Sequence, residues 1–332
     1  MDQLMTSLLD LLGELEGRGI ALMVGGGFGL YLKRLHLAGA RERTLLDRLP
    51  EPRATNDLDL FLRAEVLADL DRTRAVADAI RHLGYVPVAE AKFLQWKRQI
   101  VVAGVVQEVK IDVLVGPLGE FGKCLKINKP RVRPKGSIEF HAHMVEEALD
   151  IEGHPVTLSV SGRRSTGEPH RGTVLVPAAF PYLMMKLHAF DDRKDDADRN
   201  QGRHHALDLY TIVGMMTETE YERARALGDA HGADKHVERA RRIVRDHFGE
   251  RTALGMLRLQ EHKLFRDDFL VGEFMEVVGE IFRGVGVRQG SDSDGRYPVR
   301  PGEGPGTETA VGLFGSWHLS GSIAVDSELV FA

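Results

Sequence analysis

The chain has 332 residues, of which 43% are hydrophobic, with a net charge of −5 and a single cysteine. This length allows a sizeable core and about two domains, and one cysteine excludes an internal disulfide and any metal site built from several cysteines. The net negative charge excludes a protein that coats nucleic acid with a basic surface, so any contact with RNA or DNA must be local. No apolar run approaches the roughly 20 residues that span a bilayer, and the N-terminus lacks the basic start of a signal peptide, so we expect a cytoplasmic protein with no membrane partner.

The first 150 residues alternate between helical and strand patterns. Leucines at helical spacing predict a first helix over 4–15, and residues 39–54 are polar, contain prolines and are expected to form an inserted loop. Two strands near Gly104 are expected to form a hairpin. The other expected elements are a strand at 20–24, a glycine turn at 25–29, a helix at 30–37, a strand at 58–61, a helix at 64–84, and strands at 85–89, 93–104 and 105–116. This order predicts a small domain with a mixed sheet over 1–150.

The second half of the chain changes character twice. Residues 151–176 read as a β-ribbon connector, and residues 177–283 read as a helical domain. The tail at 284–332 is rich in Gly, Ser and Pro, which predicts that it is mostly disordered. The predicted fold class is therefore α+β, with a mixed-sheet N-terminal domain followed by a helical C-terminal domain.

Three aspartates lie in strand-like segments. In RATNDLDLF (53–61), Asp57 and Asp59 point to one face of the strand, and in VKIDVLV (109–115) Asp112 points away from the valines. If the two strands are neighbours, three carboxylates meet, which is strongly unfavourable without a cation. Mg²⁺ binds carboxylate oxygens together with waters and substrate phosphates, and two such ions can hold both oxygens of a phosphoryl displacement. Asp57, Asp59 and Asp112 are therefore candidate metal ligands.

A glycine run precedes the aspartates. Gly25, Gly26 and Gly27 lie between a strand and a helix, where free backbone N–H groups and the positive end of a helix dipole favour a phosphate. A simple tight turn is the alternative interpretation. A dinucleotide-binding turn is disfavoured because Leu30 stands where the third glycine of that fingerprint is expected, and no acidic residue follows at the usual distance.

These motifs together resemble a known group of enzymes. VGGGFGLYL, RATNDLDLF and VKIDVLV are similar, in this order, to the signature of the DNA polymerase β-type nucleotidyltransferase superfamily. Within it, the chain most resembles the AbiEii/AbiGii toxin family (MenT-like). The residues that carry this closer resemblance are Arg53, Thr55, Leu60 and Phe61 around the aspartate pair, and Lys186, Leu187, Ala189, Arg193, Asp208 and Leu209 in the helical stretch 182–213. Two features depart from the family pattern: the 39–54 insertion, and His204 and His205 where a Lys-Asp pair is expected.

The resemblance implies a nucleotidyltransferase fold and a Mg²⁺-dependent transfer of NMP from an NTP to an acceptor hydroxyl. It implies that the glycine turn positions the triphosphate, that Asp57 and Asp59 bind two Mg²⁺ ions, and that Asp112 shares a metal and activates the hydroxyl. It further implies that Lys186 contacts the triphosphate and that Asp208 orients Lys186. The implied acceptor is RNA such as a tRNA 3′ end, and the implied partner of such a toxin is an antitoxin protein.

Several alternatives stay open on the sequence alone. A small-molecule acceptor such as an antibiotic, a protein acceptor, and a catalytically inactive nucleotide-binding module are the competing functions. The basic stretch 123–135 has six Lys or Arg residues among thirteen, and it is interpreted as a solvated loop or as a contact for an RNA backbone. His204 and His205 diverge by about 100° on a helix, and His141 and His143 lack a carboxylate or cysteine partner at a diagnostic spacing, so neither pair predicts a metal site. No residue identifies the preferred NTP.

Overall fold

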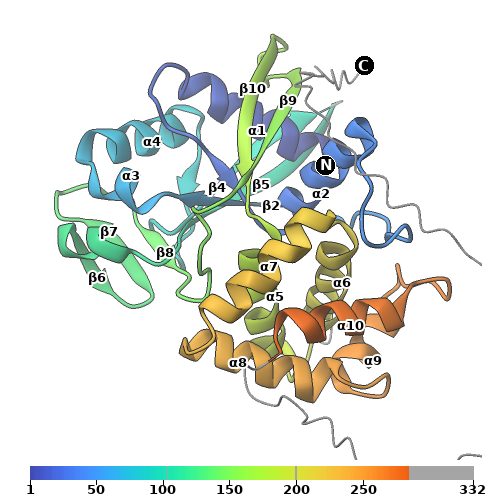
Figure 1. Cartoon of the computed structure of the whole chain (residues 1–332). Coiled ribbons are helices and arrows are strands. Elements are labelled where there is room, and N and C mark those ends of the chain that lie inside the picture. The colour runs from blue at the N-terminus through green and yellow to red at the C-terminus, as the bar shows by residue number, and fades with distance from the viewer. Residues whose placement is uncertain (103, 199, 284–332) are drawn as a thin grey trace, which may run out of the picture. The chain divides into compact units, whose positions relative to one another are not determined.

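A mixed ten-stranded sheet forms the first part of the fold (Figure 1). The computed structural model describes residues 1–102, 104–198 and 200–283. The strands are β1 (Met23–Val24), β2 (Asp57–Leu62), β3 (Val86–Pro87), β4 (Gln95–Val102), β5 (Val105–Val115), β6 (Leu125–Asn128), β7 (Arg131–Pro134), β8 (Ala142–Met144), β9 (Val156–Arg163) and β10 (Pro169–Val176). Their order is β6-β7-β8-β5-β2-β1-β10-β9, with β4 paired to β5 and β3 to β4.

Parallel and antiparallel pairs both occur in this sheet. Strands β2 and β5, β5 and β8, and β1 and β10 run parallel, whereas the other pairs are antiparallel. The predicted α+β class with a mixed sheet is thereby confirmed. The β4–β5 hairpin turns at Gly104, as predicted, where φ is +78°.

The helices of the described chain are α1 (Asp2–Glu14), α2 (Gly26–Ala40), α3 (Ala64–Ala68), α4 (Leu70–His82), α5 (Ala179–Arg193), α6 (Asn200–Gly214), α7 (Glu218–Ala230), α8 (Lys235–Ile243), α9 (Leu254–Gln260) and α10 (Val271–Ile281). Helices α1 and α4 pack against the sheet, and helices α5 to α10 gather in a cluster of their own (Figure 1). Two short turns accompany them, η1 (Gly119–Cys124) and η2 (Val244–Phe248). Within the described residues, none of these helices has the length and apolar character needed to cross a membrane.

The two faces of the sheet differ in chemistry. On one face Leu58, Leu60 and Ile111 are buried and pack in one cluster with Leu8 of α1 and Ile80 of α4. Alternation then directs the aspartates of β2 and β5 to the other face. That other face becomes apolar towards the ends of the two strands, where a small cluster includes Phe61, Leu114 and Met185 of α5. The second large apolar cluster lies among helices α5 to α10.

Several predicted boundaries are wrong. The helix expected over 64–84 breaks at Asp69, whose carboxylate accepts hydrogen bonds from the backbone N–H groups of Asp71 and Arg72 and so caps α4. The helix after the glycine turn begins at Gly26 and extends to Ala40. The stretch 123–135, interpreted as a solvated loop or as a contact for an RNA backbone, contains the β6–β7 hairpin, so the loop is wrong and the RNA contact stays a prediction.

The predicted β-ribbon is present, and it extends the main sheet. Strands β9 and β10 pair along their whole length, and Leu175 of β10 lies opposite Met23 of β1 in a parallel pair. The predicted disordered tail, 284–332, lies outside the described residues. Its disorder therefore stays a prediction.

A buried histidine in α5 predicts acid sensitivity of the fold. His188 is 2% exposed, its Nδ1–H donates to the Met184 carbonyl, and its Nε2 has no partner. Burial lowers the pKa of His188 to about 4. The carbonyl of Met184 and Asp192 favour the charged ring, while Arg239 and His236 oppose it. The folded chain therefore favours the neutral form of the His188 ring.

The sign of the pH effect follows from this shift. The pKa of His188 is lower in the folded chain than its ordinary value of 6.5, so its contribution to stability is complete above pH 6.5 and is lost as the pH falls towards 4. We expect the free energy of unfolding of His188→Leu to fall less than that of the wild type over this window, by up to roughly 3 kcal/mol. Urea denaturation at several pH values measures the difference, and parallel pH profiles for the two proteins contradict it.

Candidate active site

The parallel pairing of β2 with β5 brings the three predicted aspartates onto one surface. Asp59 lies directly opposite Asp112, and Asp57 lies opposite Lys110. The neighbouring strand β4 places Gln95 on the other side of Asp112, where the Gln95 Nε2 donates to Asp112 Oδ1 at 2.8 Å. The predicted juxtaposition of the three carboxylates is therefore present in the fold.

The glycine turn lies against the same carboxylates. The backbone N–H of Gly25 donates to the Asp59 carbonyl at 2.8 Å, which joins the turn to β2. Gly26 has φ +59°, and a Cβ added there would lie 1.6 Å from Asp59 Oδ2. A Cβ on Gly27 would lie 2.9 Å from Arg53 Nη2. The absence of side chains in the turn thus makes room for Asp59 and Arg53, and the predicted contact with a phosphate stays a prediction.

Helices α5 and α6 contribute a buried ion triad. Lys186 of α5 is 8% exposed, and its Nζ lies 2.7 Å from Oδ2 of Asp208 on α6. Arg53 binds the same carboxylate with two hydrogen bonds, from Nε to Oδ1 at 2.9 Å and from Nη2 to Oδ2 at 3.0 Å. The ion pair of Lys186 with Asp208 is the contact that the resemblance implies, and the role of Lys186 towards a triphosphate stays a prediction. The contact of Arg53 was missed, because nothing in the sequence shows that residue 53 meets a helix 155 positions later.

Further contacts anchor these helices to the turn. The Tyr182 hydroxyl on α5 donates to the Gly26 carbonyl at 3.2 Å, one turn of helix before Lys186. Met185 packs with Phe61 at the apolar end of the sheet face. These contacts hold the Lys186–Asp208 pair beside the glycine turn and β2.

The site carries more carboxylates than cations. Asp57, Asp59, Asp112 and Asp208 face Arg53 and Lys186, with Lys110 at the edge. Burial raises the pKa of Asp59, and the charge of Asp57 raises it further, against the effect of Lys186. Burial and the charge of Asp59 raise the pKa of Asp112 to about 6. Burial also raises the pKa of Asp208, but Lys186 and Arg53 outweigh it and hold that pKa well below its usual range.

This charge balance suits a divalent cation. As the side chains stand, the described residues contain no group of three or more His, Cys, Asp or Glu gathered closely enough to hold a metal ion. Mg²⁺ does not require such a cage, because it usually takes one or two carboxylates and completes its shell with waters and substrate phosphates. Asp57, Asp59 and Asp112 are the carboxylates from which it would take these one or two ligands.

The two histidines that depart from the family pattern are neutral and structural in their contacts. His204 Nδ1 lies 3.0 Å from Nε2 of His262, whose Nδ1 accepts from the Leu264 backbone N–H at 3.1 Å. Burial and the charge of Lys186 together lower the pKa of His205 to about 3. His205 Nδ1 is buried without a partner. Neither ring adds a charge to the triad around Asp208.

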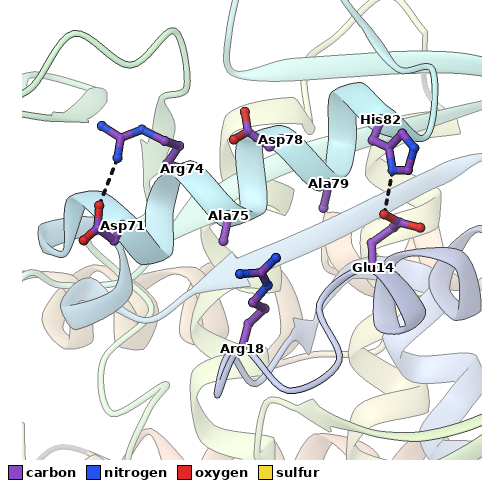
Figure 2. Close-up of a pocket in the computed structure, with 8 residues that line it drawn as sticks. All are labelled: Glu14, Arg18, Asp71, Arg74, Ala75, Asp78, Ala79 and His82. Atoms are coloured by element: carbon purple, nitrogen blue, oxygen red, sulfur yellow. Dashed lines mark hydrogen bonds and ion pairs between the residues drawn. The ribbon is translucent and has the colours of Figure 1, made fainter.

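A wide cavity lies elsewhere and does not have the chemistry of this site. It has a volume of about 390 Å³ and lies between the end of α1 and α4 (Figure 2). Arg74 pairs with Asp71 at 2.9 Å, and His82 Nδ1 lies 2.7 Å from Glu14 Oε2, so these lining side chains already have partners. Helices α1 and α4 pack on the sheet face opposite to the aspartates.

Comparison with known proteins does not assign this chain. No protein-family model and no curated protein matches its sequence. Function is therefore inferred from the site itself and from the sequence motifs that form it.

Substitution at Gly26 tests the packing of the turn against Asp59. We expect Gly26→Ala to lower any activity of this site by roughly 100-fold, because the new Cβ displaces the Asp59 carboxylate by more than an ångström. Gly19→Ala is the matched control, since Gly19 has a similar φ of +64° but open space around it. Activity and thermal stability of both variants are measured together. Equal losses in the two variants would contradict the specific clash.

Proposed function

We propose that this chain is a Mg²⁺-dependent nucleotidyltransferase that transfers NMP from an NTP to an acceptor hydroxyl and releases pyrophosphate. The observation that carries this function is the placement of Asp59 opposite Asp112 on parallel strands, against the Gly26 turn and beside the Lys186–Asp208 pair. Carboxylates on adjacent strands supply the hard oxygen ligands for a cation, while the turn and the lysine are suited to phosphate oxygens. The resemblance to the AbiEii/AbiGii toxin family supports the same activity.

Each residue of the site has its own role in the proposed transfer. The acceptor oxygen forms a bond to the α-phosphorus, the bond from that phosphorus to pyrophosphate breaks, and the Asp112 carboxylate accepts the hydroxyl proton. Lys186 and Arg53 offset the charge of the triphosphate, and Asp208 holds both cations in place. Asp57, Asp59 and Asp112 would hold Mg²⁺, which when bound would neutralise charge on the reacting oxygens.

The sheet favours RNA as the acceptor. Lys110 lies on the face that carries Asp112, and the register through β8 and β7 places Arg131 and Arg133 on that face as well. Lys126 of β6 lies opposite Arg133 and continues the basic surface. A row of cations that leads away from the reacting groups suits the phosphate backbone of a polynucleotide better than a small molecule. In this proposal the protein is a toxin, with a tRNA 3′ end as acceptor and an antitoxin protein as partner.

A labelling experiment separates the competing acceptors. The full chain is incubated with Mg²⁺ and each of the four NTPs labelled at the α-phosphate, together with total RNA, proteins or a small-molecule extract. Label in RNA that decreases steeply with added salt supports the proposal. If the label is found only in small molecules, or only in proteins, that class of molecule is the acceptor and RNA is not. No label with any NTP or acceptor contradicts the transfer activity and favours an inactive nucleotide-binding module. EDTA serves as the control for the metal.

A further inference from the structure

Gln95 is a polar residue of the site that none of the sequence motifs includes. It is the first residue of β4 and lies opposite Asp112, to which its Nε2 donates at 2.8 Å. On the basis of the proposed function, we propose that Gln95 is a positioning residue that holds Oδ1 of Asp112 and leaves Oδ2 for the cation or the attacking hydroxyl. A carboxylate held by one oxygen presents the other in a defined direction.

The backbone around Gln95 is built to hold this side chain in place. The Gln95 N–H donates to the Ala91 carbonyl at 3.0 Å, and its carbonyl accepts from the Val88 N–H at 2.9 Å. Two residues earlier, Phe93 has φ +70°, a conformation that an aromatic residue adopts only where its surroundings enforce it. The Phe93 ring packs edge-on against His141 with a centroid distance of 5.3 Å. The turn that leads into β4 is thus held to the backbone of Gln95 and to His141.

An uncharged donor suits this position for a chemical reason. The amide of Gln95 orients the carboxylate without repelling a cation, whereas a lysine or arginine there would compete with the metal. Hydrogen bonds from a second layer of residues to metal-binding carboxylates typically change metal affinity or activity by roughly 10–100-fold when they are removed. Gln95 has the geometry of such a group.

The test compares two glutamines on the same face of β4. Gln95→Met keeps the size of the side chain and removes the donor. Gln99→Met is the matched control, because Gln99 is exposed and lies opposite Glu108, four residues from Gln95. Mn²⁺ binding to the full chain is measured by electron paramagnetic resonance, and kcat and KM for the NTP are measured at limiting Mg²⁺.

We expect Gln95→Met to weaken Mn²⁺ binding by roughly 10–100-fold and to lower kcat with little change in KM, whereas Gln99→Met matches the wild type. Gln95→His restores an N–H donor at a similar reach, and it should recover part of the Mn²⁺ affinity. A folded Gln95→Met that binds Mn²⁺ like the wild type would overturn the role of Gln95 alone. If Gln95→Met does not fold, a Gln95→His variant that binds Mn²⁺ no better than a folded Gln95→Leu overturns it. A wild type that neither binds Mn²⁺ nor transfers nucleotide overturns the proposed function together with this role.

Discussion

Asp59→Asn is expected to reduce nucleotide transfer by roughly 10³-fold or more, which corresponds to about 4 kcal/mol of transition-state stabilisation, while the chain stays folded. The asparagine has the same shape, so the contacts with the glycine turn and with β5 are kept. It removes the negative charge that the cation needs beside Asp112. Transfer of label from an α-labelled NTP measures the effect. Retention of transfer within tenfold of the wild type would show that Asp59 is not a metal ligand.

The same substitution is expected to stabilise the metal-free protein. Burial and Asp57 raise the pKa of Asp59, so its ionised form destabilises the fold at neutral pH, and a neutral amide avoids that penalty. Thermal melts in EDTA should therefore give a higher midpoint for Asp59→Asn than for the wild type. Added Mg²⁺ should raise the midpoint of the wild type and leave that of the variant nearly unchanged. A loss of activity that accompanies a lower midpoint in EDTA would indicate a damaged fold instead.

Asp10→Ala is expected to destabilise the fold by roughly 3–5 kcal/mol, although residue 10 lies far from the aspartates of the site. Asp10 of α1 is 1% exposed and binds the Arg98 guanidinium, which is also buried and donates to the Ser7 hydroxyl at 3.2 Å. Its other oxygen accepts from the Ser165 backbone N–H at 2.9 Å. The pair thus joins α1, β4 and the β9–β10 turn. Its loss leaves the charge of Arg98 buried without the Asp10 carboxylate that neutralises it.

Two comparisons make this stability prediction specific. Asp78 forms an ion pair with Arg81 at 3.2 Å but is 63% exposed, so Asp78→Ala should change the free energy of unfolding by only about 0.5 kcal/mol. The double variant Asp10→Ala with Arg98→Met should be more stable than Asp10→Ala alone, because no unpaired charge remains buried. Urea denaturation measures all three. Equal effects of the Asp10 and Asp78 substitutions would contradict the importance of burial.

The alternation of residues predicted the local geometry of the site well. Leu58 between two aspartates, and the valines and Ile111 around Asp112, determine which side chains reach the same face once the strands are neighbours. The pairing of β2 with β5 and its register depend on contacts between segments that are distant in the sequence. The alternation of residues within one strand cannot predict such contacts. The resemblance of the motifs supplied this step.

The strands and contacts that the sequence did not predict have two kinds of physical cause. Strands β6 to β8 are only three or four residues long, with prolines at 130 and 134 and many basic residues, so they lack the pattern of a buried strand. Arg53 and Gln95 were missed because their roles depend on partners brought in by the fold, Asp208 on α6 and Asp112 on β5. The break between α3 and α4 at Asp69 is predictable from the sequence, because an aspartate directly before an amphipathic segment is a common N-cap of a helix.

The proposed activity is tested most directly by comparing one NTP labelled at the α-phosphate with the same NTP labelled at the γ-phosphate. The full chain is incubated with each form, Mg²⁺ and total RNA, and the acceptor and the released phosphates are separated. We expect the α-label in the acceptor and the γ-label in pyrophosphate, with neither product formed by Asp59→Asn. A γ-label in the acceptor, or an α-label that never leaves the free nucleotide pool, would contradict nucleotidyl transfer by this site.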